Sequence, residues 1–165
     1  MISQERFEKG ECVLYGARAV CRVSEIGPLP FGEKTRQYYT LRPVFEAHGE
    51  TIYAPLESRI SMRRVMSAGE AERVLAEAAG PENERAEDPI VQQEALQSQD
   101  CRQLMGCVKA LRRREAELLS RKKHLREADR KFLEHAEKLL YGELAAALDT
   151  TPELVRARTE AQFGI

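Results

Sequence analysis

The sequence predicts an α+β protein in which a small five-stranded β-barrel, residues 1–66, is followed by a helical bundle, residues 67–165. Short segments rich in β-branched and aromatic residues, separated by glycine and proline, occupy the first part. In the second part the apolar residues recur at steps of three and four, the period of an α-helix. A chain of 165 residues with 42% hydrophobic residues is long enough for two compact modules.

Apolar runs between turn residues indicate the strands of the first part. Gly16 lies between two such runs and allows the positive φ of a tight turn. Prolines and glycines at residues 27–32 predict a loop, and residues 47–50 predict a turn. Two strands are expected within residues 7–26 and the others at residues 36–44, 51–55 and 59–65. Five short strands bury their apolar face best when the sheet curves and closes into a barrel.

Capping residues indicate the helix boundaries of the second part. Ser67 begins a first helix, which ends at Ala-Gly-Pro, residues 79–81. Asp100 is expected to cap a second helix, and Thr151, followed by proline, begins the last one. A long helix is expected near residues 127–148, and its apolar stripe should pack on that of the helix after Asp100. The stripe of that earlier helix contains Cys101, Leu104, Met105, Val108, Leu111, Leu118 and Leu119.

The segment of residues 80–89 combines two prolines with several acids. Such a composition buries little apolar surface. We therefore expect a linker or a flexible loop, at which the barrel and the helices can move relative to each other.

Several function classes are disfavoured by the sequence. Cys12, Cys21, Cys101 and Cys107 form no CxxC pair and the three histidines are scattered, so neither a metal site nor a disulfide framework nor a cofactor is expected. No Gly-rich phosphate loop or Ser/His/Asp set indicates an enzyme with a small-molecule substrate. The chain begins with charged sequence and has no stretch of about 18 apolar residues, so a cytoplasmic protein without a membrane partner is expected.

The strand segments carry a family resemblance. The run Phe7-Glu8-Lys9-Gly10-Glu11-Cys12-Val13-Leu14-Tyr15-Gly16, then Tyr38-Tyr39-Thr40-Leu41, Ile52-Tyr53-Ala54-Pro55 and Arg63, resembles the RNA-polymerase-binding module of the CarD family of bacterial transcription regulators. That module also occurs in transcription-repair coupling factors. Ala17 departs from the glycine usual near that turn. The segment Leu96 to Leu111 and the run of residues 136–145 resemble the helical domain of the same family.

The resemblance implies a Tudor/SH3-like barrel that binds the RNA polymerase β subunit through an exposed strand edge and nearby polar side chains. Main-chain pairing at such an edge supplies affinity, and alternating side chains supply specificity. The positions that match the contact region are Thr51, Ile52 and Tyr53, with Arg36 and Arg42 nearby. The alternative for Tyr53 is that it is a half-buried aromatic residue of the barrel without a binding role. The alternative for the arginines is that they are strand residues whose charges are simply solvated.

The net charge of the chain is −1, but the charges are unevenly distributed and one segment is basic. Residues 109–131 carry ten Lys/Arg against four acids, which suits neutralisation of phosphates on promoter DNA without sequence readout. The alternative is a solvated helix surface with intrahelical ion pairs. The candidate DNA-binding residues are Lys109, Arg112, Arg113, Arg114, Arg121, Lys122, Lys123 and Arg126.

A departure from the family pattern concerns the DNA wedge. Known family members place a tryptophan in the minor groove at the upstream edge of the promoter bubble, but this chain has no tryptophan. The corresponding region, residues 85–89, is acidic and offers no aromatic replacement. Phe132 and Tyr141 fit the helical core better than a groove. Two hypotheses remain: a non-enzymatic regulator that steadies the promoter complex through backbone contacts, or a protein-only adaptor whose helices bind another protein.

Overall fold

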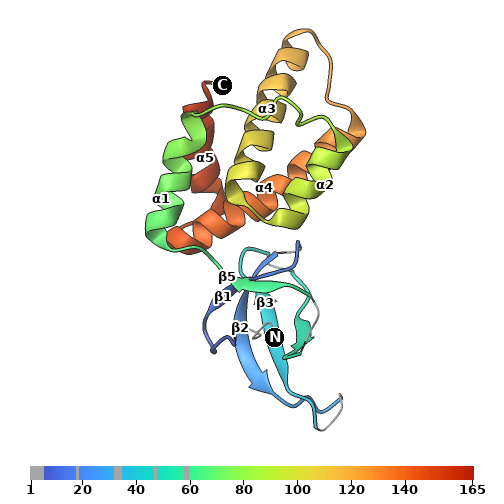
Figure 1. Cartoon of the computed structure of the whole chain (residues 1–165), viewed down its shortest axis with the longest axis vertical. Helices are drawn as coiled ribbons and strands as arrows, with labels where there is room; N and C mark the ends of the chain where they lie inside the picture. Colours follow the sequence, from blue (N-terminus) through green and yellow to red (C-terminus); the bar gives the residue numbers. More distant parts are fainter. Residues whose placement is uncertain (1–5, 18, 32–34, 47, 58–59) are drawn as a thin grey trace. The chain divides into compact units, whose positions relative to one another are not determined.

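The computed structural model of the chain describes residues 6–17, 19–31, 35–46, 48–57 and 60–165 (Figure 1). In these residues the protein is α+β, with one five-stranded antiparallel sheet and five α-helices. Two compact units can be distinguished, the N-terminal unit Met1–Val65 and the helical unit Met66–Ile165. No helix in the described ranges is both long and apolar enough to cross a membrane.

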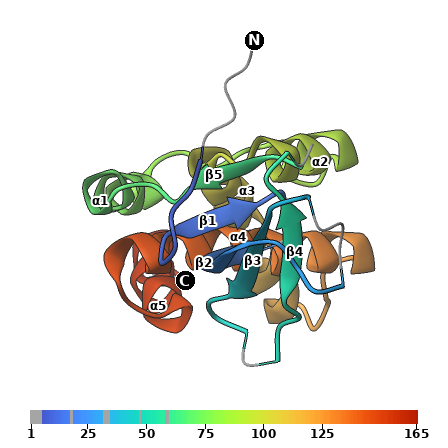
Figure 2. The ribbon, with the colours of Figure 1, turned by 90° about the horizontal axis from the view of Figure 1, so that it is seen from below.

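The sheet contains five strands in the order β4-β3-β2-β1-β5 (Figure 2). The strands are β1 Cys12–Tyr15, β2 Ala19–Gly27, β3 Tyr38–Pro43, β4 Ile52–Pro55 and β5 Met62–Arg64. The expected order of strands and helices along the chain is confirmed, but the sheet is not closed: β4 and β5 lie at its two ends. Gly32, Ala47 and Arg59, which fall in the predicted loop, turn and last strand, lie outside the described residues.

The turn and the core of the N-terminal unit follow from the sequence pattern. Gly16 has the expected positive φ, 55°, between β1 and β2. Alternate side chains of β1 to β4 form the core of this unit, and Leu14 and Val20 on the other face are buried as well. Phe7 closes this core, packing edge-on against Tyr39 with ring centroids 5.8 Å apart, and its N–H donates to the Tyr39 hydroxyl at 3.2 Å.

The helical unit begins with α1 and is built around α4. Its elements are α1 Ala68–Ala76, the 3₁₀ turn η1 Glu77–Ala79, α2 Pro89–Ser98, α3 Cys101–Ser120, α4 Glu127–Leu148 and α5 Pro152–Phe163. The three predicted N-caps are confirmed: Ser67 accepts from Glu70 N–H, Asp100 from Arg102 N–H and Thr151 from Leu154 N–H.

Helix α4 packs against α1, α3 and α5. The predicted stripes of α3 and α4 meet, and Leu139, Leu140 and Leu144 are buried together with Phe132 and Tyr141. The prediction for the end of α3 is wrong, because Leu119 is 51% exposed. Residues 112–120 contain no buried side chain, so the last turns of α3 extend beyond the core.

The predicted linker at residues 80–89 is also wrong. This segment packs on α3 within the helical unit: Asn83 N–H donates to the Gly106 carbonyl at 3.1 Å, and Ala86 is 2% exposed. The second proline begins helix α2, which was not predicted, and Asp88 caps it by accepting from Ile90 N–H at 2.9 Å. The acids and prolines therefore belong to a capped helix start.

The two units meet along the chain at residues 65 and 66. Val65 N–H donates to the Cys12 carbonyl at 3.3 Å, inside the N-terminal unit. Met66 N–H donates to the Glu143 carboxylate at 2.8 Å, inside the helical unit. The backbone is therefore hydrogen-bonded on both sides of the division.

Candidate functional site

Strand β4 forms a free edge of the sheet, since it pairs only with β3 among the described strands. Leu56 N–H donates to the Gln37 carbonyl at 3.1 Å. In an antiparallel pair, residues that bond to the neighbouring strand alternate with residues whose N–H and C=O point away from it. Counting back from Leu56 in steps of two, the backbone groups of Ala54 and Ile52 bond to β3. Those of Tyr53 and Thr51 therefore point to the free edge.

The side chains of this edge lie on two faces. Ile52 is partly buried and packs against the core of the sheet. Tyr53 lies on the opposite face and is 44% exposed, as alternation along a strand requires. Its ring packs edge-on against Phe31, with centroids 5.1 Å apart, and Phe31 is itself 68% exposed. The strand thus offers an exposed aromatic pair beside unpaired backbone groups.

The arginines predicted to lie near Tyr53 are both exposed. Thr40 is the cross-strand partner of Tyr53, so Arg42, two residues further along β3, lies on the same face. Arg36 precedes β3 in the connection from β2. The structure therefore brings Arg42, Thr51 and Tyr53 to one surface, which with Phe31 we call the β4 edge surface.

The eight candidate DNA-binding residues do not form one exposed surface. Lys109 is 7% exposed, and its ammonium donates to the Gly80 carbonyl at the end of η1. Arg112 forms ion pairs with Glu137 and, at 2.7 Å, with Glu115, and its side chain is only 16% exposed. Both residues are thus built into the packing of the helical unit.

The other candidates on α3 and at the start of α4 are exposed, but acids neutralise most of them. The pairs are Arg113 with Glu82 at 3.3 Å, Arg114 with Glu117 at 3.4 Å and Glu87 at 3.6 Å, Arg121 with Glu117 at 3.2 Å, and Arg126 with Asp129 at 2.9 Å. Lys122 and Lys123 are exposed and have no acidic partner within the part of the chain that is described. The available positive charge therefore lies in the loop between α3 and α4.

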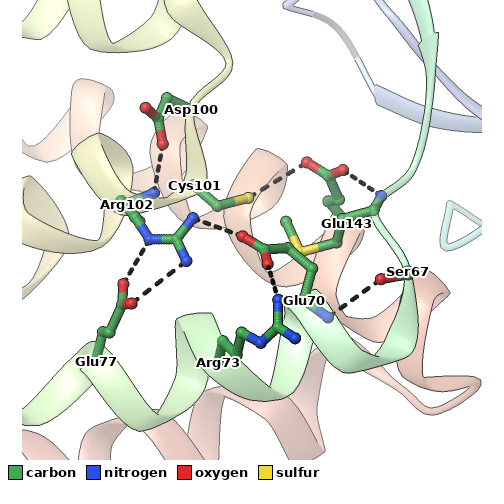
Figure 3. A network of polar contacts seen from close by, with 9 residues as sticks. Ser67, Glu70, Arg73, Glu77, Asp100, Cys101, Arg102 and Glu143 are labelled. Atoms are coloured by element: carbon green, nitrogen blue, oxygen red, sulfur yellow. Dashed lines mark hydrogen bonds and ion pairs between the residues drawn. The ribbon is translucent and has the colours of Figure 1, made fainter.

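Two residues that hold the helical unit together were not singled out from the sequence. Arg102 on α3 forms ion pairs with Glu70 at 2.7 Å and Glu77 at 2.6 Å (Figure 3). The Arg102 guanidinium, followed by that of Arg73, holds the pKa of Glu70 below its ordinary value. Glu143, 1% exposed, is the second residue. A single acid inside the apolar run of α4 was the available signal for it.

Comparisons with known proteins supply no family: no family model matches this chain, and no curated protein matches it significantly. Among the described residues no group of three or more His, Cys, Asp or Glu side chains could hold a metal ion. None of the four cysteines belongs to a disulfide. The function must therefore be inferred from the β4 edge surface and from the loop between α3 and α4 that carries Lys122 and Lys123.

Proposed function

We propose that this chain is a cytoplasmic, non-enzymatic bacterial transcription regulator. Its N-terminal unit binds the RNA polymerase β subunit, and the loop between α3 and α4 contacts the backbone of promoter DNA. The observation that carries the proposal is the free β4 edge with Tyr53 exposed beside it, at the position that matches the contact strand of CarD proteins. We further propose that the sheet is an open form of a Tudor/SH3-like barrel, because β1 pairs with both β2 and β5.

The edge has the chemistry for adding a strand from a partner. The N–H and C=O groups of Tyr53 and Thr51 that point to the free edge have no partner among the described strands. Such groups give main-chain affinity that does not depend on the partner's sequence. The aromatic pair of Tyr53 and Phe31 adds apolar area, and exposed aromatic residues dominate many interfaces. A tethered protein also needs only weak DNA contacts, because tethering raises their effective concentration.

Replacing Tyr53 by alanine is expected to weaken binding of the full chain to core bacterial RNA polymerase by at least about tenfold, the effect typical of an aromatic anchor. Surface plasmon resonance with immobilised polymerase measures this. Ile26→Ala is the matched control, since Ile26 is 40% exposed but pairs in register with the core residue Tyr39, on the opposite face. Equal affinities for both variants and the wild type would place the interface elsewhere.

Replacing Lys122 and Lys123 by glutamine is expected to weaken DNA binding and to reduce the slope of log K against log salt by about two, one unit for each lost phosphate contact. Fluorescence anisotropy with a promoter duplex at several salt concentrations gives this slope. The control R73Q/R156Q removes the same charge from α1 and α5. A control with the same loss of slope would show that net charge alone acts.

The alternative function, a protein-only adaptor, is favoured by one observation. Six of the eight candidate cations already contact a carboxylate or a carbonyl inside the helical unit. Such pairing reduces the charge that is free to displace counterions from DNA. Tight polymerase binding without salt-sensitive DNA protection would support the adaptor.

A further inference from the structure

Two arginines lie directly opposite each other on adjacent strands of the sheet. Arg22 on β2 and Arg42 on β3 are direct cross-strand partners, and both are exposed. Like charges in directly opposed positions destabilise a sheet. The pair is therefore a cost to the folded N-terminal unit, unless a ligand of opposite charge offsets it.

No acid of the described structure offsets this charge. The guanidinium of Arg22 donates to the Gly10 carbonyl at 3.0 Å, a neutral partner that holds it in place. Among the described residues no carboxylate forms an ion pair with Arg22 or Arg42. Glu11 and Glu50 are next to these arginines in register but alternate onto the other face, and Glu11 pairs with Arg64 at 2.8 Å. On the same face, Glu25 pairs with Lys9 at 3.0 Å. This part of the face keeps an excess of positive charge.

The arginine pair continues the β4 edge surface. Leu41 pairs with Ile52, so the next positions, Arg42 and Thr51, lie opposite each other on the outer face. Thr51, Arg42 and Arg22 thus form one row that runs inward from the free edge. Thr51 and Arg42 are both exposed.

We infer that Arg22 and Arg42 bind carboxylates of a protein segment that pairs with β4 and carries acidic residues over this row. The inference rests on the proposed function and specifies the chemistry of the partner. Arginine forks bind carboxylates in a bidentate manner, and complementary charge sets both specificity and association rate. A protein segment fits better than a nucleic acid, because the unpaired N–H and C=O groups of Tyr53 and Thr51 require a backbone with matching groups.

The test compares the full chain with its R22Q/R42Q variant in binding to core bacterial RNA polymerase. We expect at least about tenfold weaker binding and a smaller dependence on salt for the variant. The control R73Q/R156Q, which loses the same charge from the helical unit, should bind within about twofold of the wild type. The thermal midpoint of R22Q/R42Q should equal or exceed that of the wild type, since a repulsive pair is removed. Equal polymerase affinity of R22Q/R42Q and the wild type would overturn the inference.

A second arm separates this inference from the proposed function. If the wild type does not bind polymerase, the ¹⁵N-labelled full chain is titrated with the peptide acetyl-(Val-Glu)₃-amide, its Lys counterpart and a DNA duplex. Shifts of the arginine Nε–H signals that only the acidic peptide produces, and that vanish in R22Q/R42Q, would retain the acidic partner and reject polymerase. Absence of such shifts, or equal shifts with the duplex, would overturn the inference.

Discussion

Replacing Glu143 by alanine is expected to lower the free energy of unfolding of the helical unit by about 3 kcal/mol. The carboxylate is 1% exposed and accepts from Met66 N–H at 2.8 Å and from Cys101 Sγ at 3.3 Å (Figure 3). Alanine would leave the Met66 N–H without this acceptor and open a cavity beside the first residue of α3. Urea unfolding of the full chain, followed by circular dichroism at the helix band, measures the loss.

The matched control for this change is Glu134→Ala on the same helix. Glu134 is exposed and pairs with Arg130 at 3.0 Å, so its replacement should cost less than about 0.5 kcal/mol. Glu143→Gln keeps the size and one acceptor oxygen and should lose less than Glu143→Ala. If Glu143→Ala were no more harmful than the control, the buried carboxylate would not hold the start of the helical unit.

Replacing Arg112 by methionine is expected to cost about 3 kcal/mol, the lower end of the range for a buried ion pair, because Glu137 is buried and Arg112 is partly buried. Among the described cations, Glu137, whose side chain is 8% exposed, would keep only Arg156, 4.0 Å away. Burial, followed by the charge of Glu137, already raises the pKa of the neighbouring Tyr141. The buried hydroxyl of Tyr141 makes no hydrogen bond in the described structure, so it does not share the charge of Glu137 with Arg112.

A double-mutant cycle with Glu137→Met checks the origin of this loss. The double variant R112M/E137M should be more stable than R112M, because no charge is left buried without its main partner. Chemical denaturation of the four proteins gives the coupling energy. If R112M were as stable as the wild type, the ion pair with Glu137 would not stabilise the fold, and Arg112 would again be a candidate DNA-binding residue.

Local signals in the sequence were enough for most helix boundaries. Ser67, Asp100 and Thr151 each cap a helix as expected, because a cap involves residues only two or three positions apart. The prediction of a linker is wrong at Asp88 and Pro89, where the acid and the proline begin helix α2. A capped helix start and a polar loop share their composition, and only the packing of Ala86 on the helical unit distinguishes them.

Features that depend on distant residues could not be predicted. Arg112 and Lys122 look alike in the sequence. In the structure Arg112 forms an ion pair with Glu137 on another helix, whereas Lys122 is exposed. The opposition of Arg22 and Arg42 depends on the register of β2 and β3, which shifts between Val23 and Glu25. Likewise the free edge at β4 follows from the strand order, a property of the whole sheet.

The open edge of the sheet has a consequence for how the protein behaves in a crowded cell. Unpaired strand edges promote association between identical chains. A second copy that approached β4 would bring its own Arg22 and Arg42 to the same outer face, so repulsion opposes pairing between copies. A strand with carboxylates meets attraction at the same place, and the charge pattern thereby separates a foreign partner from the protein itself.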